Sequence, residues 1–301
     1  SSAIEVLLTY VVPNIEKLKS KTFAKAQKEF PALDDVLRGL HHFAPNMIED
    51  VYVRLAPIFA RWFVSFQQDK AVVGVIAHAA NIPEAASLLF DNKIVPPLLA
   101  ALDNRQISDP ENFRPLWIEL VKTTTALVRH VPDKMLPLTS KSKLHVKIIT
   151  RLRSYTEEEG GIAHLSELNL STVRYSTELV NALMASSDQF LRECVFSYQV
   201  LDLLLPIVRD HNPDPILLRH CIDGLSTILK GDETRKAYAE QIIEKLGNIT
   251  PLLQYLGGQK YGLMVAKAEA ILNEQEAVPG EEVAESNVSL NEMTNPYAIR
   301  L

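Results

Sequence analysis

The feature that most constrains this fold is a helical pattern that recurs about every 50 residues. Each copy ends in a segment with two adjacent aliphatic residues and a third aliphatic residue three positions later. The second residue of each pair is Leu99, Ile149, Leu205 or Leu253, at separations of 50, 56 and 48 residues. Repeats of this size indicate stacked supersecondary units, because one unit cannot bury its apolar face alone. We therefore expect an all-α solenoid.

Composition narrows the classes of function. Hydrophobic residues make up 47% and charged residues 23% of the 301 residues, as in folded soluble domains, and 11 glycines are few for a sheet-and-turn protein. The net charge of −6 provides no general attraction to nucleic acid or to anionic membranes. Two cysteines, Cys194 and Cys221, are too few for a disulfide scaffold or a four-cysteine zinc site. We expect buried free thiols and a cytoplasmic protein, with the nucleus as the alternative location.

No stretch reaches the roughly 18–20 consecutive apolar residues that a membrane span needs. Direct insertion into a membrane is therefore not expected.

The chain is expected to divide into three regions. Residues 1–60 are helical in pattern but irregular, as a terminal cap with one solvent-facing side would be. Residues 61–274 carry the repeats and form one continuous solenoid with the cap. Residues 275–301 follow a change of character, since Glu274 to Glu285 includes five glutamates and no apolar stripe. They are predicted to be an acidic extended tail.

Within the repeats, periodicity predicts helices separated by Pro, Gly and short polar turns. The expected helices are 71–80, 85–90, 94–102, 113–131, 144–155, 173–184, 198–209, 216–230, 249–256 and 263–272. The first of these is apolar nearly all round, which is typical of a helix buried between neighbours.

Two junctions between helices resemble the armadillo repeat. They read NIPEAASLLFDNKIVPPLLAAL at residues 81–102 and DETRKAYAEQIIEKLGNITPLLQYL at residues 232–256. The resemblance covers about residues 60–273. HEAT repeats, built from similar helices, remain the alternative. The resemblance implies a right-handed superhelix whose third helices line a concave groove for protein partners.

Armadillo proteins often carry an asparagine in a stretch like A-L-x-N-L-A that binds the backbone of an extended peptide. Aligning that stretch gives one candidate groove residue per repeat: His78, Arg129, Asn181 and Thr227. Only Asn181 matches the family residue, and only an amide both donates and accepts in this way. His, Arg and Thr at the other three positions depart from the family pattern and argue against binding of an extended peptide backbone. We therefore expect the groove to receive a helix or a folded surface of a protein partner.

A basic stripe is a second candidate site. Lys143, Lys147 and Arg151 are spaced i, i+4 and i+8, so on a single helix they would share a face. Such a stripe suits an acidic peptide, a phosphorylated partner, a lipid headgroup or the acidic tail, whether from the same chain or from a neighbour. The alternative is a solvated outer face opposite the aliphatic residues of 148–152.

No pattern for catalysis, cofactor binding or metal binding is present in the sequence. None of the eight histidines forms an HExxH pair, and the chain contains no glycine-rich phosphate loop and no G-x-S-x-G turn. His220 and Cys221 are adjacent, and adjacent helical side chains do not face each other. We expect a chain that is not an enzyme and has no cofactor.

Three functional hypotheses follow. The first is a non-catalytic scaffold or adaptor that presents a groove to protein partners. The second is an autoinhibited module whose acidic tail occupies its own groove or basic stripe. The third is an enzyme or cofactor-binding protein on a helical scaffold, which would require a titratable pair in a deep pocket.

Overall fold

The computed structural model describes Pro13, Lys17 and residues 23–29, 31–66, 69–104, 111–156, 165–209 and 214–246. The regular elements of these residues are all helical. The α-helices are α3 (Phe23–Glu29), α4 (Leu33–Phe43), α5 (Glu49–Phe66), α6 (Lys70–Ala80), α7 (Pro83–Asp91), α8 (Val95–Asp103), α10 (Arg114–His130), α11 (Pro132–Ser142), α12 (Leu144–Thr156), α13 (Glu167–Ser186), α14 (Asp188–Arg192), α15 (Val200–Arg209), α16 (Pro215–Ile228) and α17 (Asp232–Leu246). Short 3₁₀ turns lie at Ala44–Asn46 and Glu111–Phe113, and a π-helical turn lies at Glu193–Ser197.

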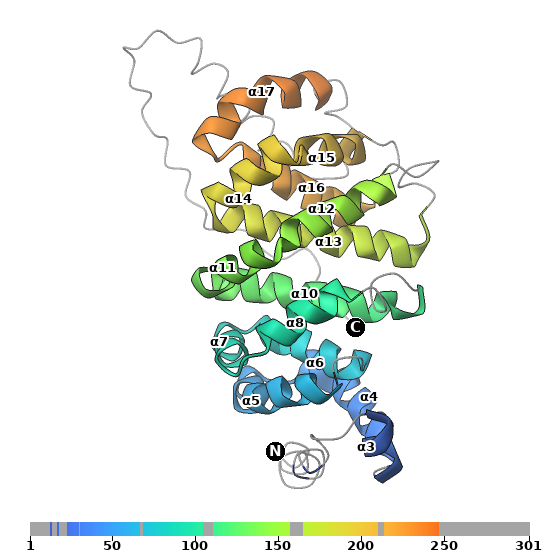
Figure 1. Cartoon of the computed structure of the whole chain (residues 1–301). Coiled ribbons are helices and arrows are strands. Elements are labelled where there is room, and N and C mark those ends of the chain that lie inside the picture. The colour runs from blue at the N-terminus through green and yellow to red at the C-terminus, as the bar shows by residue number, and fades with distance from the viewer. Residues whose placement is uncertain are drawn as a thin grey trace, which may run out of the picture.

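The helices stack into an elongated α-solenoid, from α4 at one end to α17 at the other (Figure 1). The most extensive contacts between helices are those of α6 with α10, α10 with α13 and α13 with α16. We call these four helices the third helices of successive repeats. Helices α8, α12 and α15 form a second layer against α10, α13 and α16. These second-layer helices carry the paired aliphatic residues of the recurring pattern, and the prediction of an all-α solenoid is confirmed. The fourth pair, at Leu253, lies outside the described residues.

Helix boundaries follow from local chemistry. The side chains of Asp69, Ser166 and Asp214 accept hydrogen bonds from backbone N–H groups in the first turns of α6, α13 and α16. Proline occupies the first turn of α7, α8, α10, α11 and α16, where its missing N–H has no helical partner to lose. A new helix therefore begins soon after each short turn. The positions of these capping residues and prolines along the chain set the length of each repeat.

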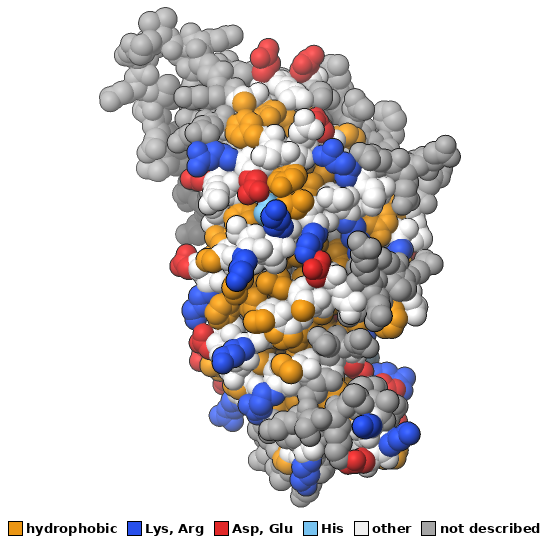
Figure 2. All heavy atoms as spheres, viewed as in Figure 1, with side chains coloured by type: hydrophobic (Ala, Val, Ile, Leu, Met, Phe, Trp, Pro, Cys, Tyr) orange, Lys and Arg blue, Asp and Glu red, His pale blue; other side chains and the backbone are white. Residues whose placement is uncertain are grey.

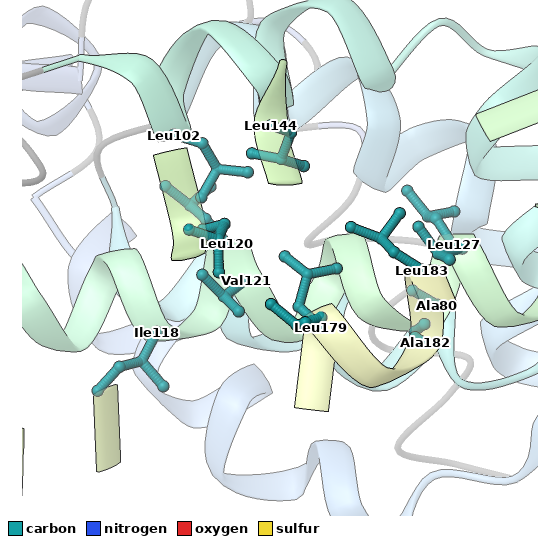
Figure 3. Close-up of a cluster of buried hydrophobic side chains, with 14 of the residues drawn as sticks. Ala80, Leu102, Ile118, Leu120, Val121, Leu127, Leu144, Leu179, Ala182 and Leu183 are labelled. Atoms are coloured by element: carbon teal, nitrogen blue, oxygen red, sulfur yellow. The ribbon is translucent and has the colours of Figure 1, made fainter. Parts of the chain in front are cut away.

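The core runs continuously through the stack. Figure 3 shows Leu120 and Leu127 of α10 beside Leu179 and Leu183 of α13 and Ala80 of α6, and all five side chains are fully buried. Burying a leucine contributes roughly 1.5–3 kcal/mol relative to leaving it exposed. Each repeat therefore depends on its neighbours for much of its stability.

The N-terminal region contains a long helix that the sequence analysis did not predict. Helix α5 runs from Glu49 to Phe66 with Pro57 inside it, so the expected boundary between residues 60 and 61 falls within a helix. Phe59, Trp62 and Phe63 of α5 are among the largest buried side chains of the described core. The division of the chain into domains stays a prediction.

Two segments between the predicted helices differ from expectation. Residues 132–142 form α11, although the sequence predicts a break at Pro132-Asp133 and no helix before residue 144. Met135 and Thr139 bury one face of α11 while Pro137 faces solvent. The segment after α13 forms α14 and the π-helical turn, which places Cys194 and Val195 in the core. In both cases tertiary burial outweighs weak local periodicity.

Within the described residues, no single helix is both long and apolar enough to cross a membrane. Only α7 and α8 counted together meet that length and composition, and they are bent by 86°. The helices expected at 249–256 and 263–272 and the acidic tail lie outside the described residues.

Candidate functional site

The four groove candidates lie on four consecutively stacked helices: His78 on α6, Arg129 on α10, Asn181 on α13 and Thr227 on α16. Residues that are about 50 positions apart in the sequence therefore lie on neighbouring stacked helices, one on each third helix. The four side chains differ in what they contact, and these contacts decide which of them can meet a partner.

Arg129 presents a charge to solvent. Its Nη1 lies 2.8 Å from Oε1 of Glu178 on α13, and 46% of the Arg129 side chain is exposed against 18% of Glu178. The ion pair links two repeats, and its exposed cationic half remains able to meet a partner.

Asn181 is turned into the fold. It is buried, and its Nδ2 donates a 2.6 Å hydrogen bond to the backbone carbonyl of His220 on α16. A Cβ atom added at Gly224 would lie 2.6 Å from Oδ1 of Asn181, so the two helices approach closely at this glycine. The amide that matches the family residue therefore holds α13 to α16.

His78 and Thr227 occupy the two ends of the row. His78 is half-buried, its ring centroid lies 6.4 Å from that of His41 on α4, and burial followed by the charge of Lys122 lowers its pKa, against the opposing effect of Glu119. Thr227 donates its hydroxyl hydrogen bond to the carbonyl of Asp223 one turn earlier in α16. The Thr227 hydroxyl is thus used within its own helix.

Other residues of this surface were missed by the sequence analysis. Lys122, two turns before Arg129, lies 3.0 Å from Oε2 of Glu119, and its Nζ lies 5.3 Å from the ring centroid of Tyr175 on α13. His220 on α16 has its pKa lowered by burial, while the charge of Glu178 acts in the opposite direction.

We call the surface formed by these residues the ladder face; it consists of His78, Lys122, Arg129, Tyr175, Glu178, His220 and Thr227. The i+3 and i+7 spacing along each helix was the signal that could have found Lys122 and Glu178.

The basic stripe does not form as predicted. Lys143 is the left-handed residue that ends α11, with φ of 52°, so the prediction that it shares a helix face with Lys147 and Arg151 is wrong. Helix α12 begins at Leu144, directly after the left-handed residue that ends α11. Lys147 and Arg151 do share a face of α12, and both line a cavity between α8, α10 and α12.

The cysteines are buried thiols. Burial raises the pKa of Cys194 to about 12 and also raises the pKa of Cys221. Such groups are poor nucleophiles at neutral pH because they stay protonated. Among the described residues, no cluster of three or more His, Cys, Asp or Glu side chains is placed to hold a metal ion.

The comparisons with known proteins agree with this architecture. No protein-family model and no curated protein matches the chain. Among solved structures, the chain is similar to a designed armadillo repeat protein in complex with a (KR)4 peptide, with a TM-score of 0.59, 14% identity, and coverage of 88% of this chain and 100% of that chain. It is also similar to the crystal structure of an engineered protein, with a TM-score of 0.61, 13% identity, and coverage of 88% and 98%. The fold is therefore an armadillo-like solenoid.

Proposed function

We propose that this chain is a non-catalytic scaffold or adaptor that binds a protein partner along the ladder face. One observation carries the proposal: four stacked helices align polar, partly exposed side chains into a single surface that crosses three repeat junctions. One of these junctions, that of α10 with α13, carries two inter-helix contacts, Lys122 with Tyr175 and Arg129 with Glu178. The likeness to a designed repeat protein that holds a peptide supports this use of the fold.

The chemistry of the ladder face favours a helix or a folded surface as the partner. Asn181 is the one asparagine among the four aligned residues, and its Nδ2 already donates a hydrogen bond to the backbone carbonyl of His220. Arg129 and Glu178 instead offer one positive and one negative charge about 2.8 Å apart. A partner that carries both charges in a fixed arrangement would match this pair, since charge complementarity governs specificity and association rate.

Affinity capture with surface variants tests the proposal. Arg129→Ala removes an exposed charge of the ladder face, and Lys141→Ala removes an exposed charge of α11 as the matched control. We expect Arg129→Ala to weaken capture of the main partner about threefold to tenfold, since removing such a charge costs on the order of 1 kcal/mol. Lys141→Ala should leave capture unchanged.

Asn181 is unsuitable for this test, because its replacement would loosen the contact between α13 and α16. Equal loss of partner with both surface variants, or no loss with Arg129→Ala for any captured protein, would exclude the ladder face as the binding surface.

A further inference from the structure

A cavity of about 690 Å³ lies on the other layer of the solenoid, between α8, α10 and α12. It takes Arg114 and Trp117 from the first turns of α10 and shares no residue with the ladder face. The cavity lies on the side of the molecule formed by the second-layer helices. This side faces the viewer in Figures 1 and 2, where α12 passes in front of α13. Lys and Arg side chains lie among apolar ones on that surface (Figure 2).

The cavity is basic in a chain that is acidic as a whole. Three cationic side chains, Arg114, Lys147 and Arg151, line it together with one carboxylate, Asp103. Nζ of Lys147 lies 2.6 Å from Oδ1 of Asp103, with side-chain exposures of 44% and 59%. Water screens an ion pair this exposed and leaves it weak, so an incoming carboxylate can replace Asp103 at little cost.

Arg151 is held in a defined position. Its guanidinium carbon lies 4.2 Å from the ring centroid of Trp117, and Trp117 itself is buried. Stacking on an aromatic face fixes the plane of the guanidinium, and a fixed plane suits the two oxygens of a carboxylate. The stack therefore pre-organises one cation at the cavity.

The remaining wall is apolar with hydroxyl groups among the side chains. Leu99 and Leu102 of α8 face Leu144 and Ile148 of α12, and Ser142, Thr150, Ser154 and Tyr155 contribute hydroxyl groups. A ligand that matches this lining carries several carboxylates and also aliphatic side chains. An acidic peptide with interspersed valines or leucines has this chemistry.

We propose that this cavity receives the acidic tail of the same chain through residues 275–290. That segment contains four glutamates and no lysine or arginine, and its aliphatic side chains are Val278, Val283, Val288 and Leu290. The charge of the segment complements the cavity, and the valines and leucine match its apolar wall. The 28 residues between Leu246 and Gln275 include the helices expected at 249–256 and 263–272. With those two segments helical the connection still spans up to about 60 Å, which is several times the roughly 8–10 Å between packed helices.

Tethering makes even a weak contact effective. A flexible connection holds a segment near its site at an effective concentration on the order of 1 mM. If the free peptide bound with a Kd of about 100 µM, the intact chain would bind added peptide about tenfold more weakly than a chain whose own tail cannot compete.

The first experiment measures this competition. A fluorescein-labelled peptide of residues 275–290 is titrated with the full chain and with a full chain in which Glu276, Glu281, Glu282 and Glu285 are changed to Gln. Fluorescence anisotropy should show about tenfold tighter binding to the Gln chain. A chain lacking residues 275–301, checked for native helix content by circular dichroism, should behave like the Gln chain. A peptide with the same four Glu→Gln changes should not bind either chain.

The second experiment maps the site in the Gln chain. Lys147→Glu and Arg151→Glu should each weaken peptide binding about fivefold to tenfold, because each reverses a cation that lines the cavity. Lys143→Glu is the matched control, since Lys143 lies in the turn before α12 and does not line the cavity. It should change the affinity less than twofold. Asp103→Asn should tighten binding by releasing Lys147.

Several outcomes would overturn the proposal. Equal peptide affinity for the full chain and the Gln chain would mean that the tail does not occupy the cavity in the same molecule. A Lys143→Glu effect as large as that of Lys147→Glu would indicate attraction to general positive charge instead of a site. A dimer that dissociates when the tail is removed would assign the tail to the cavity of a second copy.

Discussion

Individual side chains decide how closely neighbouring repeats approach. Gly224 of α16 faces both Asn181 of α13 and Leu204 of α15, and an added Cβ would lie 2.6 Å from Oδ1 and 2.8 Å from Cδ1 of these residues. Gly39 of α4 has no atom within 4 Å of the same added Cβ. Both glycines lie inside α-helices, but only Gly224 is packed closely against side chains of neighbouring helices.

We therefore expect Gly224→Ala to lower the free energy of unfolding by roughly 1–3 kcal/mol, the usual cost of forcing a methyl group into a packed interface. Gly39→Ala should raise the free energy by about 0.5–1 kcal/mol through helix propensity. Urea unfolding followed by circular dichroism measures both. Similar effects of the two changes would contradict the close approach of α13 and α16.

His78 should make stability depend on pH. Burial, with the nearby charge of Lys122, lowers the pKa of His78 below its value in the unfolded chain. As pH falls through about 6.5, the unfolded chain takes up the proton first, so the free energy of unfolding decreases. His78→Gln should reduce the difference between urea midpoints measured at pH 7.5 and pH 5.5. An unchanged difference would show that His78 keeps the same pKa in both states.

At the scale of the element, one carboxylate can both start a helix and join two repeats. Asp214 accepts a hydrogen bond from the backbone N–H of Leu217 at 2.8 Å and pairs through both oxygens with Arg174 of α13, at 2.8 and 2.6 Å. Both side chains are largely buried, and the hydrogen bonds to Arg174 and Leu217 lower the pKa of Asp214 despite its burial. Asp69 caps α6 in the same way through Val72.

We expect Asp69→Ala to cost about 1 kcal/mol, the usual value of a helix cap. Asp214→Ala should cost about 2–3 kcal/mol, because it also removes the main partner of a part-buried arginine that keeps Glu167. Asp214→Asn should fall between these values, since the amide oxygen still caps the helix. Thermal or urea unfolding of the three variants tests the order, and equal losses at the two caps would argue against the inter-repeat role of Asp214.

At the scale of the whole molecule, each repeat packs chiefly against its neighbours. Helix α16 contacts α13 and α15 extensively, whereas α5 contacts α6 and α7 at the other end. In such arrays stability is the sum of repeat and interface terms, and cooperativity along the stack is limited. Damage at one end should therefore remain largely local.

Ile222→Ala in α16 and Phe59→Ala in α5 test this expectation, since each of these residues is only 1% exposed to solvent. Each change should cost about 2–5 kcal/mol. Hydrogen–deuterium exchange in mild urea should show lost protection in α13 and α15–α17 for the first variant and in α5–α7 for the second. Uniform loss along the chain in either variant would mean that the solenoid unfolds as a single cooperative unit.

Some helices could be predicted from the sequence because their apolar pattern is strong and lies within one short segment. The segment 71–80 is apolar nearly all round, and it became the buried helix α6 within one residue of its predicted start. The segment 132–142 is polar and contains Pro137, so its local signal is weak, and only contact with the neighbouring helices makes it α11. Likewise, i+4 spacing placed Lys143 on a helix, whereas its left-handed backbone places it in a turn.

The sequence by itself determined the all-helical class, the repeat length and one position on each stacked third helix. These features depend on apolar periodicity and on proline and capping residues, which act within a few neighbours along the chain. Only the tertiary structure decided that Asn181 bonds to the next helix, that Arg129 pairs with Glu178, and that Lys147 and Arg151 share a cavity with Arg114. The first two contacts join residues 39 and 49 positions apart, and the cavity is lined from separate helices. No local sequence pattern encodes contacts over such separations.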